Sequence, residues 1–215
     1  MRAALLLVTS KRGLAGGFNT NLNKEAKRRI EMLEAQGYGV DLHIVGRKGI
    51  GFFKYLGRKL ETARIDIGDR PTVEHARELV ESLIEGFGSG RLASVDLVYA
   101  KFVSTIPTPP TTLRRLPVEA ASASQTGIRP ECSRKPGPAG SPDKPLPPWA
   151  RGAAYRGLVE TAAAEHGARR TAMKNATDNA GEILELLKRT YNRQRQAQIT
   201  QEIAEIVGGA SALQG

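Results

Sequence analysis

Short apolar runs alternate with helical patterns through the first 106 residues of the chain. Strands are predicted where apolar and β-branched residues run together, over Ala3–Val8, Val40–Val45, Arg64–Ile67 and Ser94–Ser104. Helices are predicted where apolar residues recur three and four positions apart, over Leu22–Gln36, within Arg47–Lys59 and over Thr72–Gly86. This alternation predicts an α/β fold class, with a small Rossmann-like, mostly parallel sheet domain over 1–106.

The last part of the chain carries a different pattern. From Tyr155 to Leu213 there is no proline, and good helix formers fill the stretch. A helix from Glu165 to Val207 would be roughly 60 Å long at about 1.5 Å per residue, which exceeds the width of a small domain. Its apolar residues step by three and four, the spacing of a coiled-coil seam, at Met173, Ala176, Ala180, Ile183, Leu187, Ile199, Ile203 and Ile206.

The seam predicts a long helix that packs against a partner outside the α/β domain, since an isolated helix is marginal in water. Polar residues between Leu187 and Ile199 interrupt it. The alternative is an ordinary core helix with one amphipathic face, but such helices usually run about 8–20 residues.

A Pro-rich segment separates these two parts. Eleven of the twelve prolines lie between Pro107 and Pro148, with Ser, Thr, Gly and Arg between them. Such a segment cannot bury enough apolar surface to order itself. We therefore predict an α/β domain over 1–106, an unstructured and atypical segment over 107–154, and a coiled-coil helix over 155–213.

The charge and composition bear on the binding partners, on membrane spanning and on disulfide bonding. The formal net charge is +10, and the basic excess is spread along the chain rather than gathered in one stripe. This distribution favours acidic protein partners or anionic headgroups over nucleic acid. The longest apolar run, Ala3–Val8, is too short to span a bilayer. The single cysteine, Cys132, excludes an internal disulfide and is typical of a reducing compartment.

Two glycine-rich turns are the candidates for nucleotide chemistry. Gly13–Gly17 and Gly46–Gly51 each follow a predicted strand, but neither has the Gly-x-Gly-x-x-Gly spacing or a following Lys-Ser/Thr. Tight turns that need glycine dihedral angles are the simpler interpretation. The three histidines, His43, His75 and His166, are far apart and lack a second ligand at metal spacing. We therefore predict no catalytic residue, no cofactor site and no metal site.

Two motifs in the C-terminal stretch carry a family resemblance. They are Met173–Ala180, which reads MKNATDNA, and Tyr191–Ile203, which reads YNRQRQAQITQEI. Both resemble the C-terminal helix of the γ subunit of F-type ATP synthases. In the front half, Ser10–Asn19 resembles the turn after that subunit's first domain strand, and Lys101–Thr105 resembles its later strand. The resemblance covers about 1–106 and 152–213.

The resemblance implies a non-catalytic rotor subunit of a proton-translocating ATP synthase. In this family the γ subunit is the central shaft, and it couples rotation of the membrane c-ring to conformational change in the catalytic β subunits. The implied partners are the α, β and ε subunits and the c-ring, without nucleic acid and without a membrane span. The implied location is the cytoplasmic face of the bacterial plasma membrane. The residues implied to contact the β subunits are Arg169, Gln196, Thr200, Glu202 and Glu205.

Two departures from the family are expected. The family has a long N-terminal helix that winds around the C-terminal one, whereas this sequence starts at the first domain strand, and 107–151 does not resemble the family. One hypothesis is a truncated or frame-disturbed γ sequence, and the other is a short form with a lineage-specific loop. Two further function classes stay open: a Rossmann-like nucleotide-using enzyme, and a basic nucleic-acid-binding protein whose affinity should fall steeply with salt.

Overall fold

The computed structural model describes residues 1–104, 109–117 and 146–213. The chain divides into two compact units, Met1–Arg170 and Thr171–Gly215, and each is described by itself. Cys132 and most of the segment predicted to be unstructured lie outside the described residues. The elements, in chain order, are β1 (Arg2–Val8), α1 (Phe18–Ala35), β2 (Gly39–Val45), α2 (Arg47–Tyr55), β3 (Thr62–Arg64), α3 (Val73–Gly88), β4 (Leu92–Ala100), β5 (Pro110–Leu116) and α4 (Leu146–Leu213).

The strands of the first unit form one sheet in the order β3-β2-β1-β4-β5. The central strand β1 is parallel to both β2 and β4, with Leu5 opposite Leu42 on one side and Asp96 on the other. β3 is parallel to β2, and β5 is antiparallel to β4. The predicted mostly parallel α/β sheet and the long C-terminal helix are both confirmed.

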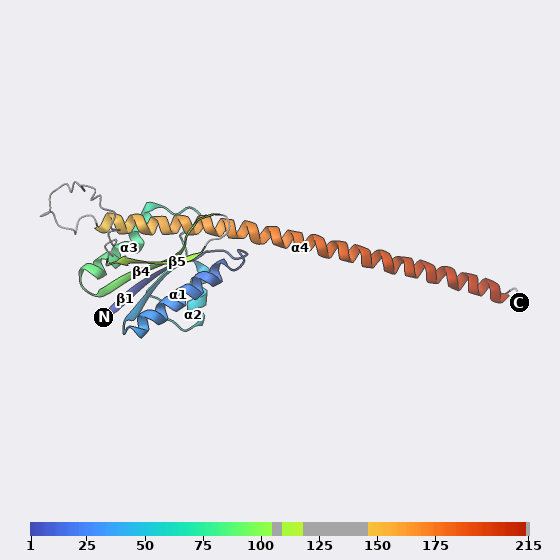
Figure 1. Cartoon of the computed structure of the whole chain (residues 1–215), viewed down its shortest axis with the longest axis horizontal. Coiled ribbons are helices and arrows are strands. Elements are labelled where there is room, and N and C mark those ends of the chain that lie inside the picture. The colour runs from blue at the N-terminus through green and yellow to red at the C-terminus, as the bar shows by residue number, and fades with distance from the viewer. Residues whose placement is uncertain (105–108, 118–145, 214–215) are drawn as a thin grey trace, which may run out of the picture. The chain divides into compact units, whose positions relative to one another are not determined.

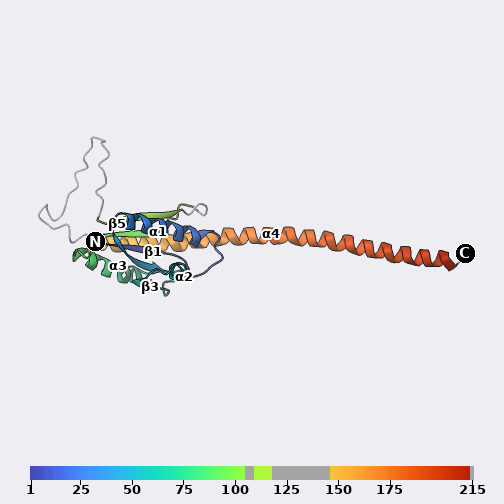
Figure 2. The same cartoon turned by 90° about the horizontal axis from the view of Figure 1, so that it is seen from below.

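Helices cover both faces of this sheet. Leu6 and Val8 of β1 lie in a core shared with α3 and the first turns of α4. Leu5 and Leu7 point the other way, into a core shared with α1 and α2. Figures 1 and 2 show these helices on the two sides of the sheet. Because both faces are buried, β1 reads as an unbroken apolar run rather than as an alternating one.

The prediction of an unstructured segment does not hold at either of its described ends. Pro110–Leu116 forms β5, and α4 begins at Leu146 rather than near Tyr155. β5 is an edge strand with a proline at its first position, where proline is tolerated in sheets. Pro147 and Pro148 stand in the first turn of α4, whose N–H groups have no intrahelical partner.

Two other boundaries differ from the prediction by a few residues. α1 begins at Phe18 rather than Leu22, because the buried Phe18 side chain packs in the core beneath the sheet. β3 covers Thr62–Arg64 rather than Arg64–Ile67, because only three of its residues pair with β2. Ile67 is buried in the other core instead, outside any strand.

A buried carboxylate connects β4 to its two neighbours. Asp96 of β4 is fully buried, and its Oδ2 accepts a hydrogen bond of 2.8 Å from Nε of Arg29 in α1. Its Oδ1 lies 3.5 Å from Nε of Arg114 in β5. The Thr112 hydroxyl of β5 donates a further hydrogen bond of 2.9 Å to Glu25 of α1. These contacts add to the antiparallel pairing of β5 with β4 and to the burial of Leu116 in the core.

Candidate functional site

The second unit carries the predicted seam on an exposed helix. Every residue from Met173 to Ser211 is exposed. The large apolar side chains of the seam range from 40% exposed at Met173 to 71% exposed at Ile206. A row of exposed apolar side chains on this scale marks an interaction surface. The candidate site of the second unit is therefore the helix surface itself.

The seam consists of two stripes that face different directions. The first contains Met173, Ala176, Ala180, Ile183 and Leu187, and the second contains Ile199, Ile203 and Ile206. At about 100° per residue, the centres of the two stripes lie roughly 120° apart around the helix axis. A partner that follows the first stripe must therefore cross the polar interval between Leu187 and Ile199 to reach the second.

Four of the predicted contact residues flank the second stripe. Gln196 and Thr200, four positions apart, share one flank, and the Thr200 hydroxyl donates to the backbone oxygen of Gln196 over 2.8 Å. Glu202 and Glu205, three positions apart, share the opposite flank, and Glu205 accepts a hydrogen bond of 2.9 Å from Gln201. The helix thus places an amide and a hydroxyl group on one side of the stripe and two carboxylates on the other.

The fifth predicted contact residue, Arg169, belongs to the first unit. Its guanidinium forms an ion pair with the carboxylate of Glu165, one helical turn earlier. The Glu165 side chain is 8% exposed and that of Arg169 is 20% exposed. Glu165 is not among the predicted site residues, although its separation of four residues from Arg169 on a helix is a usable signal in the sequence. The β-contact role of all five residues stays a prediction.

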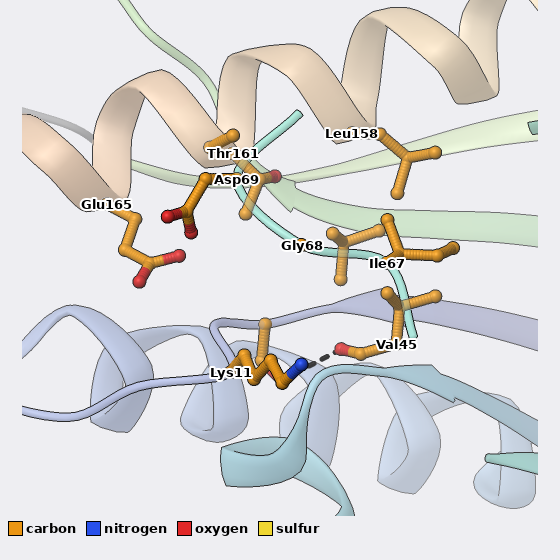
Figure 3. Close-up of a pocket in the computed structure, with 11 residues that line it drawn as sticks. Lys11, Val45, Ile67, Gly68, Asp69, Leu158, Thr161 and Glu165 are labelled. Carbon is orange, nitrogen blue, oxygen red and sulfur yellow. Dashed lines mark hydrogen bonds between the residues drawn. The ribbon is translucent and has the colours of Figure 1, made fainter. Parts of the chain in front are cut away.

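A small pocket lies at the carboxyl ends of β1 and β2, where α4 crosses the sheet edge within the first unit (Figure 3). Glu165 of α4 and Asp69 point into the same space, and Lys11 from the loop after β1 lies on its other side (Figure 3). Asp69 also forms an ion pair of 3.3 Å with Arg12. Both carboxylates thus have a guanidinium partner.

Parallel α/β sheets bind ligands at the carboxyl ends of their strands. If the chain were a nucleotide-using enzyme, its nucleotide would therefore be expected in this pocket. Its cavity measures about 20 Å³. Ligand pockets usually enclose about 300–1,000 Å³, so this cavity has room for little more than one water molecule. The geometry here does not support nucleotide binding.

The glycine-rich turn after β2 serves packing. Gly46 has a φ of 100°, and a Cβ added there would lie 2.2 Å from the backbone oxygen of Thr9. A Cβ on Gly49 would lie 2.8 Å from the Thr9 hydroxyl. That hydroxyl accepts a hydrogen bond of 3.0 Å from the Gly49 N–H and donates one of 2.9 Å to the Val45 backbone oxygen. Gly46 and Gly49 therefore let α2 approach the end of β1, as the turn interpretation predicts.

The histidines have local structural roles. The His43 ring lies 2.9 Å from the Thr62 hydroxyl, and burial lowers the pKa of His43. His75 completes a capping box with Thr72 at the start of α3. Among the described residues, no group of three His, Cys, Asp or Glu side chains could hold a metal ion. Within that same part of the chain, no helix is both long and apolar enough to cross a membrane.

Comparisons with known proteins identify the family. The ATP synthase family model that fits this chain matches residues 1–213. The chain is 51% identical over 213 residues to the ATP synthase gamma chain of Gemmatimonas aurantiaca. The aligned region covers 99% of this chain and 73% of that protein. This chain belongs to the ATP synthase gamma-chain family. The gamma chain of Streptomyces griseus is 41% identical over 221 residues, covering 99% of this chain and 72% of that protein.

The solved structures agree with this gamma-chain fold. A chain of the Euglena gracilis mitochondrial ATP synthase, solved as an OSCP/F1/c-ring assembly, superimposes with a TM-score of 0.69 at 19% identity, covering 99% of this chain and 73% of that one. A chain of the Tetrahymena thermophila central stalk and c-ring gives a TM-score of 0.60 at 21% identity, covering 82% and 77%. At such identities the likeness concerns the fold alone. The family match runs through 107–151, the segment whose composition predicted a departure.

Proposed function

We propose that this gamma chain is the central-stalk rotor subunit of a proton-translocating ATP synthase and is not itself catalytic. The observation that carries the proposal is the 51% identity over 213 residues to a bacterial gamma chain. Two features of the described residues support it. The cavity at the carboxyl edge of the sheet is too small for a nucleotide, and α4 runs for 68 residues with an exposed outer part.

The proposed partners are the α and β subunits around the long helix, the ε subunit, and the membrane c-ring. The solved relatives come from F1/c-ring and central stalk/c-ring assemblies, which supports the same kind of complex here. We place the complex at the cytoplasmic face of a bacterial plasma membrane, with this chain as a peripheral subunit. The bacterial sources of the similar gamma chains support this location.

The proposed mechanism is a population shift in the neighbouring subunits. Each β subunit would meet a different side of the helix as the helix turns. A contact that favours one conformation of β raises the population of that conformation and changes its nucleotide affinity. The amide and hydroxyl groups of Gln196 and Thr200 and the carboxylates of Glu202 and Glu205 lie on different sides of the helix and supply the required difference. We propose these four residues, together with Arg169, as the β contacts.

The apolar seam has a separate proposed role. Its exposed side chains would pack against a second helix of the rotor, as the family resemblance implies. Burying a leucine or isoleucine side chain contributes about 1.5–3 kcal/mol, so several together would hold two helices firmly. The seam would then stiffen the shaft, and the flanking polar residues would make the contacts to β.

Co-purification and ATP hydrolysis test the rotor role. The chain is co-expressed with the α and β subunits of a bacterial ATP synthase, and the complex is isolated through a tag on β. We expect the chain to co-purify and the ATP hydrolysis rate to depend on its presence. A complex that forms and hydrolyses ATP equally well without the chain would contradict the proposal. Tight nucleotide binding by the isolated chain would favour the enzyme alternative instead.

Charge-neutral variants test the contact residues in the same assay. The double variant Glu202→Gln and Glu205→Gln removes the acidic flank and should lower the hydrolysis rate of the assembled complex. Glu185→Gln is the control, because Glu185 is also exposed on α4, lies outside the proposed contact region and pairs with Arg189 of the same helix. Equal rates for the double variant and the control would show that the acidic flank does not contact β.

A further inference from the structure

Thr161 of α4 makes two buried hydrogen bonds that belong to different elements. Its hydroxyl donates to the backbone oxygen of Gly157 over 2.7 Å, within the helix. The same oxygen accepts a hydrogen bond of 3.3 Å from the backbone N–H of Ala100, the last residue of β4. Thr161 is 2% exposed and Ala100 is 1% exposed. A single side chain therefore joins α4 to the carboxyl end of a central strand.

The Ala100 N–H depends on Thr161 because the sheet provides no partner for it. The next residue, Lys101, donates its N–H to Pro109 on the β5 side, so the Ala100 N–H points toward the β1 side. There the pairing with β1 ends at Val98. A buried N–H without a partner is destabilising, and the Thr161 hydroxyl satisfies it.

Residues one helical turn away on either side extend this contact. A Cβ added to Gly157 would lie 3.0 Å from Cδ2 of Leu97 in β4, so the helix approaches the strand closely there. Glu165 points into the small pocket at the ends of β1 and β2 (Figure 3). Gly157, Thr161 and Glu165 are spaced by four residues and therefore lie on one side of the helix.

Apolar side chains make up much of the remaining contact, with Ala150, Ala154 and Leu158 in the core, and Arg151 of α4 forms an ion pair of 3.3 Å with Glu81 of α3. Apolar burial is non-directional and would tolerate a small rotation or slide of α4 along the sheet. A hydrogen bond depends on distance and angle and would not. Elsewhere on α4, Thr177 and Thr190 also donate to the carbonyl four residues earlier, at 3.0 and 2.9 Å, but both are exposed.

We infer that Thr161 is the positioning residue that fixes the rotational and axial register of α4 on the sheet, through its hydrogen bond with the Ala100 N–H. The inference rests on the proposed rotor function, because a rotor transmits torque between the sheet domain and the helix only if the two cannot slip. Thr161 touches neither nucleotide nor another subunit in this role. It acts by holding the helix in one orientation.

The test compares Thr161→Val with two controls. Thr161→Val keeps the shape of the side chain and removes the hydroxyl, whereas Thr161→Ser keeps the hydroxyl. Thr190→Val makes the same chemical change at an exposed site of α4 that has only the intrahelical bond. The rate of amide hydrogen exchange at Ala100, measured in the full chain, reports directly on the hydrogen bond between the Ala100 N–H and Thr161. It should be faster by about tenfold or more in Thr161→Val and unchanged in both controls.

The second readout is the number of protons pumped per ATP hydrolysed by the assembled complex in sealed vesicles, compared at equal incorporation of each variant. Thr161→Val should lower this ratio below the wild-type value, and Thr161→Ser and Thr190→Val should keep it. A wild-type ratio in Thr161→Val, or unchanged exchange at Ala100, would overturn the inference. If the wild-type chain itself supports no pumping, the proposed rotor function fails instead.

Discussion

The two units of this chain treat their apolar residues in opposite ways. In Met1–Arg170, helices on both faces of a five-stranded sheet bury the apolar side chains in two cores. In Thr171–Gly215, every residue from Met173 to Ser211 is exposed, including Ile199 and Ile206. The first unit satisfies its own apolar surface, whereas the second has surface that only another molecule or segment can cover. The first unit therefore buries most of its apolar side chains in its own cores, whereas the second presents an exposed apolar row that is suited to a binding partner.

Truncating one leucine in each unit should show the largest contrast. Leu5→Ala removes a fully buried side chain at the centre of β1 and should lower the free energy of unfolding by about 2–5 kcal/mol. Leu187→Ala makes the same change at a side chain that is 59% exposed and should alter it by less than about 0.5 kcal/mol. Urea unfolding followed by the fluorescence of Trp149, the single tryptophan, measures both. A similar loss for both variants would break the distinction between the units.

A pair of glycine substitutions sharpens the account of the first unit. Gly46→Ala places a methyl group against the Thr9 backbone at a φ of 100° and should destabilise the domain by about 2 kcal/mol or more. Gly51→Ala lies in α2 with open space around the new methyl group, and should stabilise by up to about 1 kcal/mol. Thermal unfolding of the two variants gives the signs. Loss of stability in both would show that the space around Gly51 is not open in solution.

Removing one carboxylate charge from each unit should give a smaller contrast. Asp96→Asn weakens the buried contacts to Arg29 and Arg114 and should destabilise by about 2 kcal/mol. Glu185→Gln removes an ion pair with Arg189 whose side chains are 72% and 81% exposed, and should change stability by less than about 0.5 kcal/mol. The midpoints of urea unfolding report both effects. Asp96→Asn with wild-type stability would mean that β5 is held by other contacts.

The smallest expected effect is the pH dependence from His43 in the first unit. Burial is the largest cause that lowers its pKa; Asp41 and Glu61 raise it, and Arg91 lowers it further. The unfolded chain therefore binds a proton at a higher pH than the folded chain, and the stability present above about pH 6.5 is lost as the pH falls below it. His43→Gln should flatten this slope in urea unfolding between pH 5 and 7. An unchanged slope would assign the pH dependence to other groups.

Local patterns in the sequence predicted the elements that depend on local features. Buried apolar runs such as Ala3–Val8 and the three-four spacing from Met173 were both visible. β5 was not visible, because Pro110–Leu116 begins with a proline and is mostly polar, and its pairing with the distant strand β4 places it in the sheet. No sequence spacing indicates that Thr161 meets Ala100, since the two lie 61 residues apart.

The predicted site divides in the same way. The spacing of the seam follows from helical periodicity, so the sequence alone predicts it, and its packing against a second helix stays a prediction. The β-contact residues rest on a family resemblance, because Gln196 and Thr200 have no local feature that separates them from other polar residues of an exposed helix. The proposed role of these residues depends on contacts with the β subunits, and the structure of a single chain does not contain those contacts.

Rotation of the chain in an assembled complex tests the rotor role most directly. The α and β subunits of a bacterial ATP synthase are fixed to a surface with this chain in the complex, and a bead is attached to its sheet domain. The account predicts that the bead turns in one direction when ATP is added and stops when ATP is removed. A complex that contains the chain and hydrolyses ATP while the bead stays still, or turns without preferred direction, would contradict it.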